Sequence, residues 1–183
     1  MQRFDQSSAT FRIFTYKEGI LSSLAHDLRI NVTSFTITLG GKDHFLEAFV
    51  DTRSLRVDCA MENGRERPDL LSARDRKDID KNIIRDVLHT DKYPDSMLLS
   101  SSMKKEGENY LVNADITLTG RRQEISFEVR KEDRKLYAAD VRLHLPDFGI
   151  KPFSALMGAI KIKPDILVYI EIPTDSISEE LLA

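Results

Sequence analysis

Apolar residues alternate with polar residues along most of this 183-residue chain, and this period of two constrains the fold more than any other feature. Apolar side chains fall on every second position from 110 to 118, and the alternation recurs over 124–130, 140–145 and 166–172. Because successive side chains of a strand point to opposite faces, each segment predicts a strand with one dry face. Short polar turns, such as Thr119–Arg121, separate the segments. The pattern therefore predicts a meander of antiparallel strands, which tolerates water on one side.

The alternation changes phase once in the first part of the chain. Apolar residues occupy the even positions from 28 to 32 but the odd positions from 35 to 39. A shift of one residue moves every side chain to the opposite face of a sheet. We therefore expect a bulge or bend near Thr33-Ser34, which is a feature of sheets that curve and close.

One segment, residues 72–89, has helical spacing instead. Ser72 and Asp75 resemble a capping box at its start, and the helix is expected to end before Pro94, because a residue that precedes proline is pushed out of the α region. The polar face of this helix carries charges of both signs. That face indicates either a solvated lid helix or a docking surface for an anionic headgroup or membrane.

Composition and spacing exclude several classes of protein. A net charge of -3 argues against general nucleic-acid binding, and no apolar run approaches the roughly 20 residues of a membrane-spanning helix. The single cysteine, Cys59, rules out an internal disulfide. His26-Asp27 is the one tempting metal-binding pair, but neighbours on a strand point to opposite faces and the other histidines lack ligand spacing. We predict no metal site, no cofactor and, without a Gly-x-Ser-x-Gly elbow, no catalytic residue.

The chain is predicted to form a single domain over residues 1–183, in which 174–183 is a short acidic tail. Roughly eight strands with apolar inner faces fit either a two-sheet sandwich or a closed barrel, and the pattern does not separate these architectures.

Several short sequences, in order, resemble the YceI-like family of bacterial proteins. The matching sequences are Ser23–Ile30, Asp51–Leu55, Asp91–Pro94, Leu99–Ser101, Ala114–Gly120 and Asp147–Ile160, and the resemblance spans about residues 11–173. It implies an all-β fold, a lipocalin-like antiparallel β-barrel of about eight strands with one inserted α-helix at about 72–89 and an elongated apolar tunnel. Members of the family are described as binding long isoprenoid chains or other amphiphilic lipids, often as dimers. A homodimer is therefore an expected assembly.

Two features depart from the family pattern. Many relatives are exported, whereas the first residues of this chain contain no apolar leader segment. This predicts a cytoplasmic location if Met1 is the natural start, and a periplasmic one if the chain has been trimmed. In addition, Leu98 stands where the family usually has phenylalanine, which removes an aromatic ring from the tunnel wall.

The resemblance predicts non-catalytic binding, storage or transport of a long-chain amphiphilic lipid, above all an isoprenoid of the polyprenyl or quinone type. Each methylene that leaves water for an apolar tunnel contributes about 0.8 kcal/mol. The candidates for the tunnel wall and its entrance are the apolar residues Phe35, Tyr110, Val112, Ala114, Phe127, Val141, Phe148, Phe153, Leu156 and Met157.

A headgroup that carries phosphate requires cationic donors at the mouth of the tunnel. The main candidates are His26, Arg29, Arg122 and Lys151, and Arg121 and Arg142 are further ones. The pair Arg121-Arg122 in a strand turn is more typical of surface charge, and Arg142 points outward unless it lies at the rim. Two other functions stay open. One is an enzyme that uses the cavity with His26 as acid or base, and the other is a packed barrel that acts in a protein complex or stress response.

Overall fold

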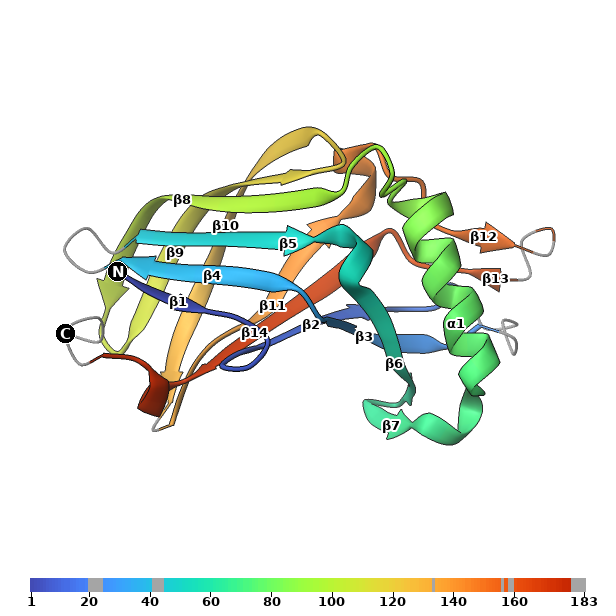
Figure 1. Ribbon diagram of the computed structural model, residues 1–183, viewed down its shortest axis with the longest axis horizontal. Coiled ribbons are helices and arrows are strands. Elements are labelled where there is room, and N and C mark those ends of the chain that lie inside the picture. The colour runs from blue at the N-terminus through green and yellow to red at the C-terminus, as the bar shows by residue number, and fades with distance from the viewer. Residues whose placement is uncertain (20–24, 41–44, 133, 156, 158–159, 179–183) are drawn as a thin grey trace.

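The computed structural model describes residues 1–19, 25–40, 45–132, 134–155, 157 and 160–178, and its main feature is one antiparallel sheet of twelve strands (Figure 1). The sheet order is β1-β4-β5-β8-β9-β10-β11-β14-β2-β3-β6-β7. In chain order the strands are β1 (Gln2–Phe4), β2 (Thr10–Thr15), β3 (Asp27–Val32), β4 (Phe35–Gly40), β5 (Phe45–Asp51), β6 (Leu55–Glu62), β7 (Arg65–Arg67), β8 (Asp95–Glu106), β9 (Asn109–Leu118), β10 (Arg121–Glu132), β11 (Lys135–His144) and β14 (Asp165–Pro173). Two short strands, β12 (Ser154–Ala155) and β13 (Ile160–Lys161), pair separately.

The predicted alternation sets the inner and outer faces of the sheet. In β9, Tyr110, Val112 and Ala114 are buried, whereas Leu111 between them is exposed. The neighbouring β10 runs antiparallel in register, so that Phe127 lies opposite Val112. Period two therefore identifies the face of the sheet that turns away from water.

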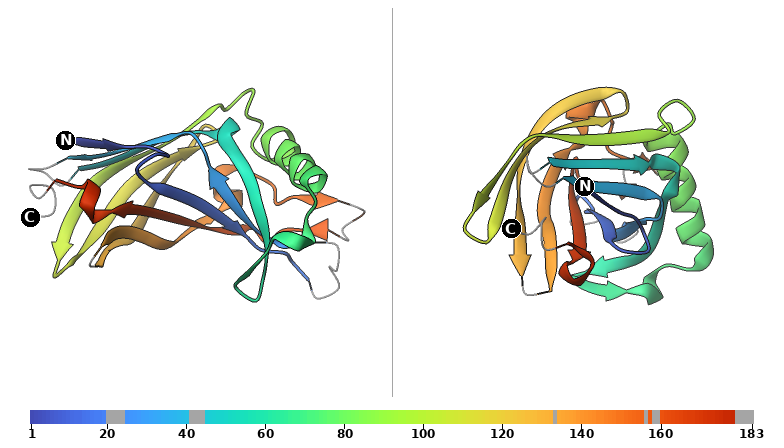
Figure 2. Two further views of the ribbon diagram at one scale, coloured as in Figure 1. Left: turned by 60° about the horizontal axis from the view of Figure 1, so that its bottom comes forward. Right: turned by 60° about the vertical axis from the view of Figure 1, so that its left-hand side comes forward.

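The expectation of a closed barrel of about eight strands is wrong in two respects. The sheet has twelve strands, and its edge strands β1 and β7 do not pair with each other, so the sheet curls without closing (Figure 2). Two of the additional strands arise because two long stretches of chain are each bent into two strands, β3 with β4 and β5 with β6, and the other two are the short edge strands β1 and β7. The first bend falls at Thr33-Ser34, where the change of phase predicts it.

Hydrogen bonds between the two bends connect the β4–β5 part of the sheet with the β3–β6 part, which lies at the other end of the strand order. The Thr33 amide and hydroxyl both donate to the Ser54 carbonyl, at 3.2 and 2.8 Å, and the Asp51 amide donates to the Ser34 carbonyl at 3.1 Å. These hydrogen bonds link the two parts of the sheet at the place where a closed barrel would have a pair of hydrogen-bonded strands.

The segment predicted as a helix over 72–89 forms α1 (Ala73–Asn82) followed by a π-helical turn over Ile83–Val87. The capping box is present, because the Asp75 amide donates to Ser72 Oγ and the Ser72 amide donates to the Asp75 carboxylate. Asp80 accepts from the Val57 amide at 2.7 Å, which fastens the helix to β6. None of the helices in the described part of the chain has the length and apolar character required to span a membrane.

The helix lies across one end of the curled sheet, on the same side of the molecule as β12 and β13, and β1 lies at the opposite end (Figures 1 and 2). The predicted acidic tail begins with a single 3₁₀ turn over Thr174–Ser176, and Ile177 after it is buried. Residues 179–183 of that tail lie outside the described residues.

Candidate functional site

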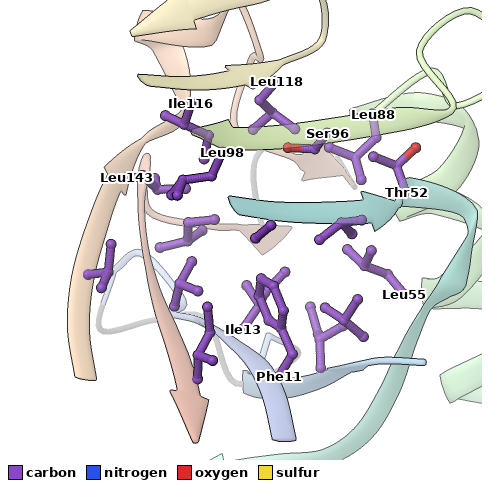
Figure 3. A pocket seen from close by; sticks show the side chains of 18 of the residues that line it. Phe11, Ile13, Thr52, Leu55, Leu88, Ser96, Leu98, Ile116, Leu118 and Leu143 are labelled. Carbon is purple, nitrogen blue, oxygen red and sulfur yellow. The ribbon is translucent and has the colours of Figure 1, made fainter. Parts of the chain in front are cut away.

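The inner face of the sheet encloses a cavity at the end that α1 covers, which we call the chamber. Its volume is about 160 Å³. By the same measure one water requires about 10–15 Å³, so the chamber has room for on the order of ten methylene-sized groups. Its lining is apolar except for Thr15, Thr52 and Ser96, and Figure 3 shows aliphatic side chains directed toward a common space. The walls come from many strands and the helix: they include Phe11, Ile13, Ile30, Ala48, Leu55, Ile83, Leu98, Ile116, Leu118, Phe127, Val141, Leu143 and Ile166.

A second cavity of about 490 Å³, the vestibule, lies between the helix and the β12–β13 hairpin. It adjoins the chamber, because the same five residues line both cavities: Thr15, Ile30, Ile83, Val87 and Leu145. Phe153, Ala155, Ile160 and Ile162 form the hairpin side of the vestibule. The vestibule therefore lies next to the chamber, on the side of the helix and the hairpin.

The polar side of the vestibule is acidic. Asp75, Asp78, Asn82 and His26 line it, and no lysine or arginine is among its described lining residues. Hydrogen bonds from the Ser72 side chain and backbone lower the pKa of Asp75. Asp78 pairs with Lys81 at 3.0 Å and more loosely with Arg74 at 3.9 Å. The lining of the mouth therefore contains carboxylates and an imidazole, and the Asp78 carboxylate is partly neutralised by Lys81 and Arg74.

Cations gather instead in a separate cleft of about 650 Å³, which we call the cationic cleft. It is lined by the basic residues Lys92, Arg121 and Lys151 and by His89. Asp86 is the acidic residue among the described residues that line it. Among the described residues, Val87 lines both this cleft and the chamber. The Arg121 side chain lies directly over Gly149, where an added Cβ would come within 2.7 Å of the guanidinium and where φ is +73°. A glycine is thus required for this arginine to reach the cleft.

The structure separates the predicted wall residues into three groups. Phe127 and Val141 line the chamber, and Phe153 lines the vestibule. Phe35, Tyr110, Val112 and Ala114 are buried in the core and line neither cavity, and Phe148 is buried beside the cationic cleft. Met157 is fully exposed and lines neither cavity, and Leu156 lies outside the described residues.

The predicted headgroup residues do not converge on one site. His26 lines the vestibule, and Lys151 lines the cationic cleft together with Arg121. Arg122 is exposed and pairs with Asp115 at 2.5 Å, and Arg142 is also exposed.

Arg29 is committed to an ion-pair network outside the cavities. It binds Glu66 and, through Nε at 2.6 Å, Asp58, and the hydrogen bond to Glu66 is the main reason that the pKa of Arg29 is raised. These pairs join β3, β6 and β7 on the outer surface. Arg29 therefore stabilises the sheet rather than the mouth of the cavity.

The dipeptide His26-Asp27 does not form a joint acid–base site. Asp27 accepts from the Lys17 amide at 2.8 Å, whereas His26 borders the vestibule. Cys59 is buried, and that burial raises the pKa of its thiol. Among the described residues no group of three or more His, Cys, Asp or Glu side chains is placed to hold a metal ion.

Few of the residues that line the cavity were among the predicted site residues, and two of the omissions are instructive. The first is Thr15, which follows Phe11 and Ile13 on the inner face of β2 and could have been found from that alternation. The second is the helix contribution of Ile83, Val87 and Leu88, whose spacing indicates an apolar face but not what that face covers. Leu98, at the position where the family usually has phenylalanine, lines the chamber.

Comparison with known proteins gives a consistent result. The sequence matches the model of a family described as the YceI-like domain over residues 3–173. UPF0312 protein plu2095 of Photorhabdus laumondii is 32% identical over 96 residues, 48% of this chain and 48% of the relative. Protein YceI of Escherichia coli is 28% identical over 95 residues, 47% of this chain and 48% of the relative. The chain thus matches about half the length of these curated relatives.

Solved structures match over more of the chain but at low identity. BcnA of Burkholderia cenocepacia has a TM-score of 0.64 at 11% identity, covering 92% of this chain and 98% of the other. A polyisoprenoid binding domain from Saccharophagus degradans, implicated in plant cell wall breakdown, has a TM-score of 0.59 at 10% identity, with coverage of 93% and 94%. At these identities the likeness shows a shared fold.

Proposed function

Because the chain belongs to the YceI-like domain family, we propose that it binds a long-chain amphiphilic lipid, with the hydrocarbon in the chamber and the polar head toward the vestibule. The observation that carries this proposal is an apolar chamber that adjoins a polar-rimmed mouth. The structural likeness to a polyisoprenoid binding domain supports an isoprenoid as the lipid.

The energetics favour a chain-like ligand. Each methylene that enters the chamber contributes about 0.8 kcal/mol, so on the order of ten such groups contribute several kcal/mol even after the cost of ordering the ligand. The methyl branches of an isoprenoid suit a wall of Ile, Leu and Val side chains, because side chains of different length and branching form an uneven surface. The lipid is held by burial, and its polar head sets its direction in the cavity.

We propose binding, storage or transport rather than catalysis. The chamber lining consists of aliphatic, aromatic and hydroxyl side chains, none of which titrates near neutral pH. His26 borders the vestibule, but Asp27 is turned to the Lys17 amide and does not orient the imidazole. If His26 acted as a general base in catalysis, a carboxylate would be expected to orient its ring, and Asp27 does not do so.

Two measurements test the proposal. Solvent extraction of the purified protein followed by mass spectrometry is expected to release a co-purifying isoprenoid or similar lipid. Titration of delipidated protein with geraniol, farnesol and geranylgeraniol is expected to give affinities that rise with chain length, by at least about tenfold for each isoprene unit that fits inside. An empty protein that binds none of these alcohols would contradict the proposal.

A further inference from the structure

The cationic cleft brings together three positive side chains that the fold does not neutralise. Lys92, Arg121 and Lys151 line it, and in the described part of the chain none of the three forms a salt bridge or donates a side-chain hydrogen bond. Arg122, the residue after Arg121, pairs instead with Asp115. Of two neighbouring arginines, the one that lines the cleft is thus the one without a carboxylate partner.

The backbone fixes the position of Arg121 in the cleft. Its guanidinium lies over Gly149, where φ is +73° and where a Cβ would come within 2.7 Å of Arg121 Nε and Cζ. A residue other than glycine at this position would be strained and would displace the arginine. The close approach of side chain and backbone distinguishes Arg121 from an arginine that extends into solvent.

Two turns beside Arg121 hold a left-handed backbone at residues other than glycine. His89 has φ +49° and Thr119 has φ +48°, and both line the cleft. The His89 carbonyl accepts from the Lys92 amide at 2.9 Å, and Thr119 Oγ1 donates to the Phe148 carbonyl at 2.7 Å. Such backbone costs free energy and is concentrated at functional sites. Here it brings three separate segments of the chain to one cleft.

The lining of the cleft indicates the class of ligand. Its three cations face a single carboxylate among the described lining residues, Asp86, and like charges held close together repel one another. An anion of charge -2 offsets more of this repulsion than a carboxylate does, and guanidinium and ammonium groups bind phosphate oxygens well. The rest of the lining is largely apolar and includes Val87, Tyr93, Phe148 and Ile150. This combination suits a phosphate that carries an apolar organic group.

We propose that the cationic cleft is a second binding site, which takes a phosphate ester with a partly apolar organic group and is separate from the lipid site in the chamber. Arg121, Lys92 and Lys151 bind the phosphate oxygens, and the apolar lining contacts the organic group. Among the described lining residues, Val87 alone is common to the cleft and the chamber, so the two sites are neighbours with different linings. This site does not depend on the proposed lipid binding.

Calorimetric titration with phenyl phosphate at low ionic strength tests the site. The wild-type protein is expected to bind phenyl phosphate with a dissociation constant below about 1 mM, and inorganic phosphate at least about threefold more weakly. Arg121→Gln and Lys151→Gln are each expected to weaken phenyl phosphate binding by about fivefold or more. Arg122→Gln is the matched control, and it is expected to change the affinity by less than about twofold, because Arg122 is outside the cleft.

Gly149→Ala tests the geometry while every charge is kept. The added methyl group is expected to displace the Arg121 guanidinium and to weaken phenyl phosphate binding about as much as Arg121→Gln does. The double variant is expected to bind no more weakly than Arg121→Gln alone, and thermal unfolding checks that each variant is folded. Wild-type affinity in a folded Gly149→Ala would overturn the placement of Arg121, and Arg121→Gln still tests the site if Gly149→Ala does not fold.

Farnesyl phosphate tests whether the site is separate, because a free phosphate ester and the phosphate head of a lipid have the same chemistry. One equivalent is expected to leave phenyl phosphate binding unchanged. Displacement in the wild-type protein but not in Ala48→Leu, whose larger side chain fills part of the chamber, would assign the cleft to the head of the chamber lipid and overturn a separate site. Displacement in both proteins would show that farnesyl phosphate itself enters the cleft as a phosphate ester.

Two further results would overturn the proposal. One is a wild-type protein that does not bind phenyl phosphate, and the other is an equal loss of affinity in Arg121→Gln and Arg122→Gln, which would indicate nonspecific attraction to surface charge. If that protein still binds farnesol, the proposed lipid binding stands without the second site.

Discussion

The two ends of the curled sheet have the same alternation but different interiors. At the end away from α1, the packed half, inner side chains are buried without lining either cavity: Phe4, Ile37, Tyr110 and Val112 are each at most 2% exposed. At the end beneath α1, the hollow half, the inner side chains surround the chamber. The difference shows that the period of a strand sets which face is dry, whereas side-chain size and the elements that cross the interior decide whether that face is filled.

The two halves also differ in what covers them. In the packed half, β1 lies along β4 and brings Phe4 into the interior. In the hollow half, α1 and its π-helical turn cover the mouth with Ile83, Val87 and Leu88, which border the cavity without filling it. The packed half is therefore filled by its own side chains, whereas the hollow half is where we propose that the ligand binds.

The largest expected effect separates the halves by stability. Ile37→Ala in the packed half is expected to lower the free energy of unfolding by about 4 kcal/mol, because it opens a cavity among close-packed neighbours. Ile13→Ala in the hollow half is expected to cost about 2 kcal/mol, because the Ile13 side chain already borders empty space. Urea unfolding measures both values. Equal costs would show that the two interiors are packed alike.

The next effect separates the halves by binding, with a matched pair of alanines. Ala48 lines the chamber and Ala114 lies in the packed core. Ala48→Leu is expected to reduce farnesol affinity at least tenfold without loss of stability, because the new side chain occupies the chamber. Ala114→Leu is expected to cost about 1–3 kcal/mol of stability through overpacking and to leave affinity unchanged. Calorimetric titration measures the farnesol affinity of both variants, and thermal unfolding measures their stability. Unchanged affinity in Ala48→Leu together with lost affinity in Ala114→Leu would contradict the account.

The smallest expected effect concerns pH and the helix that covers the hollow half. The hydrogen bonds from Ser72 place the pKa of Asp75 below its ordinary value of 3.8. A carboxylate with a lowered folded-state pKa stabilises the fold above the unfolded-state pKa, and that stabilisation is lost as pH falls through the folded-state pKa. Below about pH 4 the amides in the first turn of α1 should therefore lose protection against hydrogen exchange, measured relative to the intrinsic exchange rate at the same pH, while protection in the packed half does not change.

Asp75→Asn provides the control for this effect. The variant is expected to show fast exchange in the first turn of α1 at neutral pH and little further change on acidification. Hydrogen exchange followed by mass spectrometry measures both. Acid-induced exchange that persists unchanged in Asp75→Asn would assign the effect to another carboxylate.

Much of the fold follows from the sequence because it depends on local rules. The alternation identifies the strands, the change of phase identifies the bend at Thr33-Ser34, and Ser72 with Asp75 identifies the start of the helix. The incomplete closure could not be predicted, because it depends on how two bent stretches pair with distant partners. Residues far apart in the chain determine that pairing.

The site was harder to predict than the fold for a related reason. An inward position does not reveal the distance to the facing wall, so Tyr110 and Phe127 look alike in the sequence although only Phe127 lines the chamber. A positive charge in the sequence does not reveal its partner, and Arg29 is bound to Asp58 and Glu66. The homodimer and the cellular location stay predictions.

Methyl NMR of isoleucine-labelled protein, titrated with farnesol, tests the division of the interior most directly. The account predicts chemical-shift changes and ligand contacts at Ile116 and Ile166, which line the chamber, and none at Ile37 and Ile172, which lie in the packed core. Contacts spread evenly over all four residues, or confined to Ile37 and Ile172, would contradict it.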